Sequence, residues 1–94
     1  MSYYGLTTLS NATSSRLTPP GTHSGMDITL QNVNDAGHIY IGIDENVSST
    51  NYGFRIMPNH SISFELAGYD ALYAISEVDA MQLAMIQINL EDQD

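Results

Sequence analysis

The chain has 94 residues, no cysteine, and 11 carboxylate side chains against two arginines, which gives a formal net charge of −9 at neutral pH. A chain of this length forms one domain, and without cysteine it can hold neither a disulfide nor a thiolate metal site. The charge disfavours nucleic-acid phosphates and anionic membrane surfaces, because both bind clustered lysine and arginine. We expect a small acidic domain with no nucleic-acid or membrane partner, no signal peptide and no membrane-spanning segment.

The first 24 residues differ from the rest of the chain. They are rich in Ser, Thr and Asn, contain Pro19-Pro20-Gly21, and show no sustained hydrophobic period. A residue before proline is pushed towards extended conformations. We therefore expect residues 1–24 to form an extended arm that orders only against a neighbouring protein. The arm's expected contact residues are Tyr3, Tyr4, Leu6 and Leu9.

From residue 25 the pattern becomes that of β-structure. Apolar and polar residues alternate over 26–31, a turn signal follows at 34–37, and isoleucines alternate again over 39–43. A period of two is typical of a strand with one buried face. These two segments are predicted to pair as an antiparallel hairpin. His38 is expected to face solvent, and Tyr40 is expected to pack in the domain with its hydroxyl at the surface. The residues predicted to face the core are Ile28, Ile39, Ile41 and Ile43.

Further strands are predicted at 52–57, 61–66, 72–75 and 81–90, separated by a polar loop at 44–51 and short turns. Ile62, Phe64 and Ile86 are expected in the same core, and an acidic tail closes the chain. A single sheet would leave these apolar rows exposed to water, whereas two packed sheets cover them. The predicted fold is all-β: a small antiparallel β-sandwich, jelly-roll-like, over residues 25–94, with the extended arm preceding it.

No residue pattern indicates catalysis. His23, His38 and His60 have no metal-ligand spacing, and no serine lies in a Gly-x-Ser-x-Gly motif. Oxygen ligands gather at 44–46 and on the turn at 32–35, but their order does not match a calcium-binding EF-hand loop. A solvated polar loop is the preferred interpretation. We expect a protein that is not an enzyme and has no catalytic residue, no metal and no cofactor.

Three short motifs carry a resemblance to a known group of proteins. They are Ile39-Tyr40-Ile41-Gly42, Asn51-Tyr52-Gly53-Phe54 and Leu72-Tyr73-Ala74-Ile75-Ser76. Their succession resembles small β-sandwich proteins of tailed-bacteriophage particles. The match covers about half of the chain and consists of packing and turn residues. It implies a structural protein assembled in the host cytoplasm, namely a capsid decoration (cement) subunit on the head surface, or a small neck or tail component.

The resemblance also implies partners. A decoration subunit would bind the major capsid protein or another virion protein. A small core without disulfides favours self-association, for which we expect a homotrimer. Tyr52 and Tyr69 are further candidate contact residues, since tyrosine is enriched at interfaces. The competing class is a carbohydrate-binding or protein-binding module that uses these tyrosines as a stacking platform, although the chain has no tryptophan.

Overall fold

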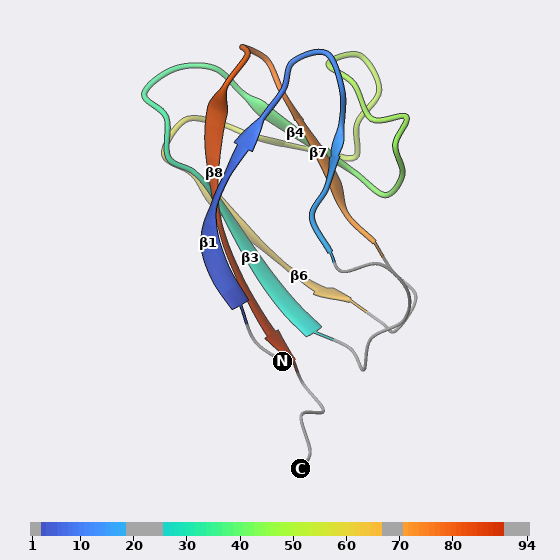
Figure 1. Cartoon of the computed structure of the whole chain (residues 1–94), viewed down its shortest axis with the longest axis vertical. Helices are drawn as coiled ribbons and strands as arrows, with labels where there is room; N and C mark the ends of the chain where they lie inside the picture. Colours follow the sequence, from blue (N-terminus) through green and yellow to red (C-terminus); the bar gives the residue numbers. More distant parts are fainter. Residues whose placement is uncertain (1–2, 19–25, 67–70, 90–94) are drawn as a thin grey trace.

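The computed structural model describes residues 3–18, 26–66 and 71–89, and these residues form strands and loops with no helix (Figure 1). Two four-stranded sheets result. Sheet A has the order β1-β8-β3-β6 and sheet B the order β2-β7-β4-β5. In chain order the strands are β1 (Tyr3–Leu9), β2 (Ser15–Arg16), β3 (Met26–Asn32), β4 (Ile39–Gly42), β5 (Phe54–Ile56), β6 (Ser61–Leu66), β7 (Tyr73–Ser76) and β8 (Met81–Asn89).

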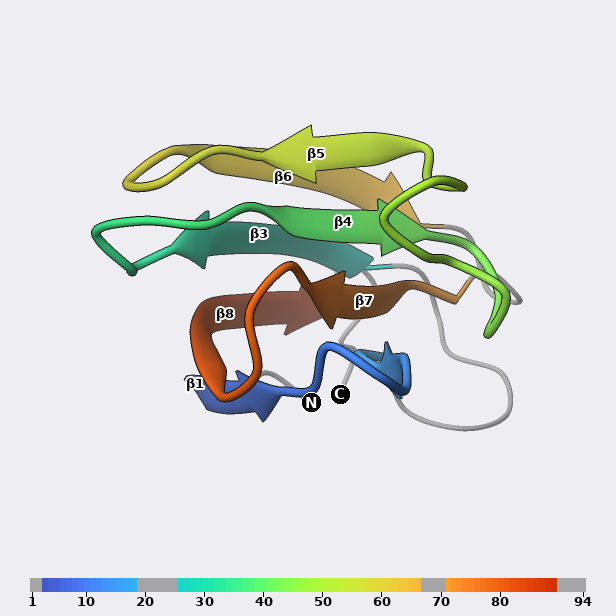
Figure 2. The same cartoon turned by 90° about the horizontal axis from the view of Figure 1, so that it is seen from above.

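The strand order is that of a jelly roll. The antiparallel pairs β1/β8, β2/β7, β3/β6 and β4/β5 follow one another along a single long hairpin, and the chain reverses direction between β4 and β5. Because the hairpin is wound up, successive strand pairs lie alternately in sheet A and sheet B, and the two sheets pack face to face (Figure 2). The prediction of a small antiparallel, jelly-roll-like β-sandwich is confirmed.

The predicted hairpin between the segments at 26–31 and 39–43 is wrong. β3 pairs with β6 and β8 in sheet A, whereas β4 pairs with β5 and β7 in sheet B. The turn between them crosses from one sheet to the other, with Gly37 at a φ of 91°. Buried Asn32 stabilises this crossing, because its Nδ2 donates to the carbonyls of Gly37 and Ile56 at 3.0 Å each.

The core lies between the two sheets. Ile28, Ile39 and Ile41 are buried there as predicted, and Ile62 and Phe64 pack against its margin. Ile43 was predicted in the same row but is 78% exposed. β4 ends at Gly42, so the alternation that points Ile39 and Ile41 inward does not continue to Ile43.

The face of β8 predicted to be buried is the exposed one. Ile86 was expected in the core, yet Ile86 and Ile88 are 44% and 49% exposed, while Leu83 is fully buried. The pairing with β3 decides this. Leu30 lies opposite Met85, and residues directly opposite each other in a sheet share a face. The polar side chain on the buried face, that of Gln87, is accommodated because its Nε2 donates to the Leu17 carbonyl at 2.8 Å.

The expected division between an arm at 1–24 and a body from residue 25 is corrected for residues 3–18. β1 pairs with β8 from Tyr3 to Leu9, and β2 pairs with β7. Leu9 is 1% exposed and belongs to the core. The sequence does not show the usual alternation of a strand here, because the apolar residues Tyr4 and Leu6 lie on the outer face of β1 while the inward positions include Gly5 and Thr7. Residues 19–25, residues 67–70 with the turn predicted around Tyr69, and residues 90–94 with the acidic tail lie outside the described residues.

Candidate functional site

The three motifs that carry the resemblance lie on, or lead directly into, the adjacent strands β4, β5 and β7 of sheet B. Ile41 of β4 lies opposite Phe54 of β5 on one side and Ala74 of β7 on the other. Gly42 lies opposite Tyr73. Segments that are separated in the sequence therefore meet at the end of β4.

The loop at 43–53 folds back over the outer face of sheet B. The amide of Gly53 donates to the Ile41 carbonyl at 2.8 Å, which brings the end of the loop back to β4. Gly42 makes room for this return, because a Cβ at position 42 would lie 2.8 Å from the Val47 Cβ. Val47 is consequently buried against the sheet.

The loop also covers Tyr40, which the sequence pattern placed on the face opposite the isoleucines. Tyr40 does face away from the core between the sheets, but it is buried in a second cluster with Val47 and Ile75. Its ring lies 4.8 Å from that of Tyr52. Burial, followed by the nearby Glu77 carboxylate, raises the pKa of Tyr40. The packing of Tyr40 agrees with the expectation from the sequence, but its cover by the loop was not predicted, because local patterns do not show where a loop packs.

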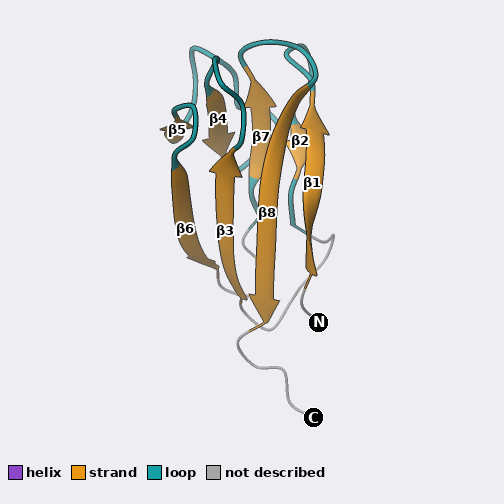
Figure 3. Ribbon diagram, turned by 90° about the vertical axis from the view of Figure 1, so that its left-hand side faces the viewer, coloured by secondary structure: helices purple, strands orange, loops and turns teal. Residues whose placement is uncertain are grey.

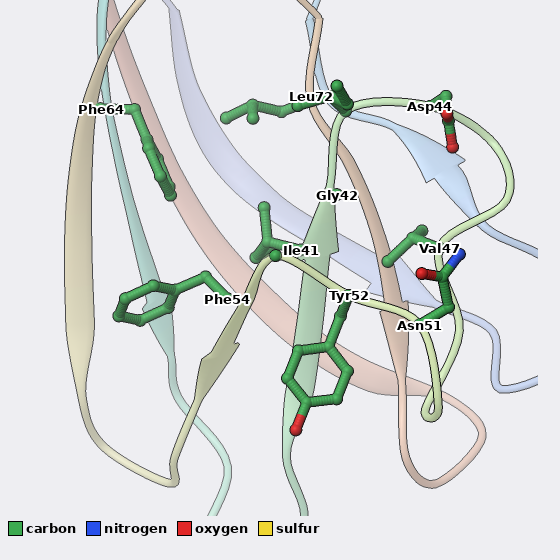
Figure 4. A pocket seen from close by; sticks show the side chains of 11 residues that line it. Ile41, Gly42, Asp44, Val47, Asn51, Tyr52, Phe54, Phe64 and Leu72 are labelled. Carbon is green, nitrogen blue, oxygen red and sulfur yellow. The ribbon is translucent and has the colours of Figure 1, made fainter.

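A pocket of about 420 Å³ opens where the loop meets the margin of the two sheets (Figure 4). Phe54 from β5 and Phe64 from β6 form one wall, with ring centroids 6.4 Å apart in an edge-to-face arrangement. Asp44 and Asn51 supply polar groups at the rim. An apolar pocket of this size with a few polar groups at its mouth suits an aromatic or aliphatic group. We call this the loop pocket; its lining residues are Ile41, Gly42, Ile43, Asp44, Val47, Asn51, Tyr52, Gly53, Phe54, Phe64 and Leu72.

The structure places the predicted contact residues in different parts of the molecule. Tyr52 is exposed and lines the loop pocket. Tyr4 and Leu6 are exposed on sheet A instead. Leu9 is a core residue, so its assignment to an interaction surface was wrong. Tyr3 is placed in β1, and Tyr69 lies outside the described residues.

The described histidines and acidic residues do not gather into a metal site: no group of three or more metal-ligating side chains occurs among them. His38 Nδ1 lies 3.0 Å from Glu77 Oε1, and His60 is exposed. His23 lies outside the described residues. The oxygen-rich segments at 32–35 and 44–46 lie at opposite ends of β4, so they do not form one calcium cluster.

The sequence patterns missed two features of this region. Phe54 was treated only as part of a motif, although it forms a wall of the loop pocket. Asn32 joins several segments, since its Oδ1 accepts from the backbone and side-chain amides of Asn34 while its Nδ2 reaches β5. Its partners Asn34 and Gly37 are local, but the bond to Ile56 of β5 joins segments 24 residues apart and could not be read from the local pattern.

No family model, curated protein or solved structure matches this chain. Within the part of the chain that the structure describes, no helix has the length and apolar character needed to cross a bilayer.

Proposed function

We propose that this protein is a non-enzymatic structural subunit of a tailed-phage particle, specifically a decoration protein that binds the head surface. The observation that carries the proposal is the convergence of the three resembling motifs on the loop pocket. The residues that carry the resemblance thus build one surface feature as well as a fold. Jelly rolls also recur in viral capsid domains, which is an analogy at the level of fold alone.

The loop pocket has the chemistry of an attachment site. Tyr52 and Phe54 present exposed aromatic surface, which dominates the binding energy of many interfaces. Asp44 and Glu45 are exposed on the same loop. Their charge favours a partner, such as the major capsid protein, that inserts an apolar side chain and surrounds it with basic residues. Association is then weakened by salt, since the charges are screened beyond about 8–10 Å at physiological ionic strength.

The test is whether the protein is present on phage particles purified from the host cells in which it is expressed. Antibody detection on purified particles should show many copies per head. Tyr52→Ala and Phe54→Ala should reduce retention on particles, whereas Thr50→Ala, in the same loop but outside the pocket lining, should not. A few copies at the neck or tail would favour the alternative component. Absence from particles would overturn the proposal.

A carbohydrate-binding module is the second candidate, and the same pocket favours it. Exposed Tyr52 and Phe54 beside Asp44 and Asn51 combine stacking surface with hydrogen-bonding groups. Lectin domains also use jelly rolls. Binding of the purified protein to a defined glycan on an array, abolished by Tyr52→Ala, would support this function instead of head attachment.

A further inference from the structure

The two sheets end in four edge strands, and one of them lacks the usual protection against pairing. β2 has two residues and β5 has three, so both offer little backbone to another strand. β6 carries an exposed charge at Glu65. β1 has seven residues, Tyr3–Leu9, with neither charge nor proline. Short strands, charges and prolines are the devices by which proteins prevent edge-to-edge association.

β1 pairs with β8 in continuous register along its whole length, which keeps the strand regular. It is the outermost strand of sheet A (Figure 3), and among the described residues no strand pairs with its other side. A strand at such an edge presents a row of N–H and C=O groups that a further strand can bind. The backbone of β1 is therefore a template for sheet extension.

The side chains next to this edge are also exposed and apolar. Tyr4 is 79% and Leu6 64% exposed, and they lie opposite Ile86 and Ala84 of β8. A shallow hollow of about 380 Å³ lies among these residues on the outer face of sheet A. Grouped exposed apolar side chains mark interaction surfaces more often than isolated ones do.

The distribution of charge indicates which molecule pairs with the β1 edge. The chain carries a net charge of −9, yet neither β1 nor β8 contains a charged residue. A basic partner finds no carboxylate on these strands to bind, whereas a second copy needs none, because strand pairing uses main-chain groups. Two acidic molecules approach each other with least repulsion where their surfaces are neutral. Like charges directly opposite each other in a sheet are destabilising, and β1 has none.

We propose that two copies of this chain pair through β1, antiparallel and about a two-fold axis, so that their A sheets become one continuous sheet. With the axis at Gly5, Tyr4 of each copy lies across from Leu6 of the other, which places the most exposed apolar side chains in contact. Because a two-fold interface of this kind is isologous, it closes after two copies. The pairing uses a different surface from the loop pocket and stands whether or not the protein is a virion subunit.

Sedimentation velocity of the full chain tests the proposal. A concentration-dependent dimer is expected, and its fraction should rise with salt, because salt screens the repulsion between the acidic bodies. The expected effect of Leu6→Glu is loss of the dimer, since it places a charge on the β1 edge of each copy. Ser61→Glu is the matched control. Ser61 lies in the same cross-strand row, at the opposite edge of sheet A, and its variant should dimerise like the parent.

A single introduced cysteine gives a second readout that does not depend on Leu6→Glu folding, because the chain has no cysteine of its own. Leu6→Cys should be crosslinked into dimers by a short bis-maleimide, and Ser61→Cys should not. A monomeric parent at high micromolar concentration in high salt would overturn the proposal. So would a trimeric mass, equal dimerisation of the two glutamate variants, or equal crosslinking of the two cysteine variants.

Discussion

Gly42 determines how the loop at 43–53 lies on sheet B. Replacing it with alanine places a Cβ at 2.8 Å from the Val47 Cβ, closer than two carbons can approach. The loop must shift, and the cluster of Tyr40, Val47 and Ile75 loosens with it. Gly42→Ala should therefore lower the free energy of unfolding by about 1–3 kcal/mol. Urea unfolding measures the loss.

Gly53→Ala is the control for this prediction. A Cβ at position 53 meets only the Ile41 carbonyl oxygen, at an ordinary 3.5 Å. Its urea midpoint should stay close to that of the parent. Equal midpoints for Gly42→Ala and the parent would show that the loop does not rest on Gly42.

Glu77 links two turns through His38. Its Oε1 accepts from the His38 amide at 2.8 Å and lies 3.0 Å from His38 Nδ1. The backbone hydrogen bond from His38, followed by the side-chain one, lowers the pKa of Glu77. Because the carboxyl pKa is lower in the folded than in the unfolded protein, Glu77 contributes stability above its unfolded pKa. That contribution is lost as pH falls through the folded pKa.

Unfolding of the parent and of Glu77→Gln at different pH values tests this linkage. The parent should be the more stable protein near pH 7, and the difference should shrink below a pH of about 4.3, the ordinary glutamate pKa. Glu45→Gln, on an exposed loop, is the control. A difference between parent and Glu77→Gln that does not change with pH would contradict the assignment.

At the scale of elements, β8 shows how pairing decides which face of a strand is buried. Apolar residues occupy both of its faces, so its own sequence favours neither. Its register with β3 turns Leu83 inward and Ile86 outward. Leu83→Ala should therefore cost about 2–5 kcal/mol of stability, the usual range for a fully buried leucine.

Ile86→Ala provides the comparison within the same strand. Since Ile86 is partly exposed on the outer face, its truncation should cost well under half of the Leu83→Ala effect. Thermal or urea unfolding of the two variants separates the two faces. A larger loss of stability for Ile86→Ala than for Leu83→Ala would show that the face of β8 with Ile86 is the buried one.

At the scale of the whole molecule, the N-terminal segment is part of the folded body. Deleting residues 1–11 removes β1, its pairing with β8 and the buried side chain of Leu9. In a domain whose net stability is about 5–15 kcal/mol, loss of a strand and a core leucine should abolish cooperative folding or lower the melting temperature by more than about 10 °C. Circular dichroism against temperature measures this. A melt equal to that of the full chain would support a separate arm after all.

Assembly also belongs to this scale. The trimer expected from the sequence and the two-fold pairing through β1 predict different masses, and sedimentation distinguishes them. Binding to a phage head through the loop pocket stays a prediction, and it does not depend on whether the protein is a dimer or a trimer.

Much of the fold could be predicted from local patterns. The strand at 61–66 was identified because Ile62, Phe64 and Leu66 alternate with polar residues, and this pattern depends only on neighbours along the chain. The candidate site was predicted in part. Tyr52 was identified as exposed, whereas Phe54 and the loop pocket were not, because the pocket forms only where β4, β5 and β6 meet.

The sequence by itself determined that the protein is acidic and free of disulfides, and that it folds as a sandwich of short strands, since charge and alternation are local properties. Only the tertiary structure decided that β1 joins sheet A, that β3 and β4 lie in opposite sheets, and that Tyr40 is covered by a loop. The physical reason is that sheet partners are chosen by hydrogen bonds and packing between segments far apart in the chain. A strand such as Tyr3–Leu9, with apolar residues on its outer face, acquires its place from β8 rather than from its own pattern.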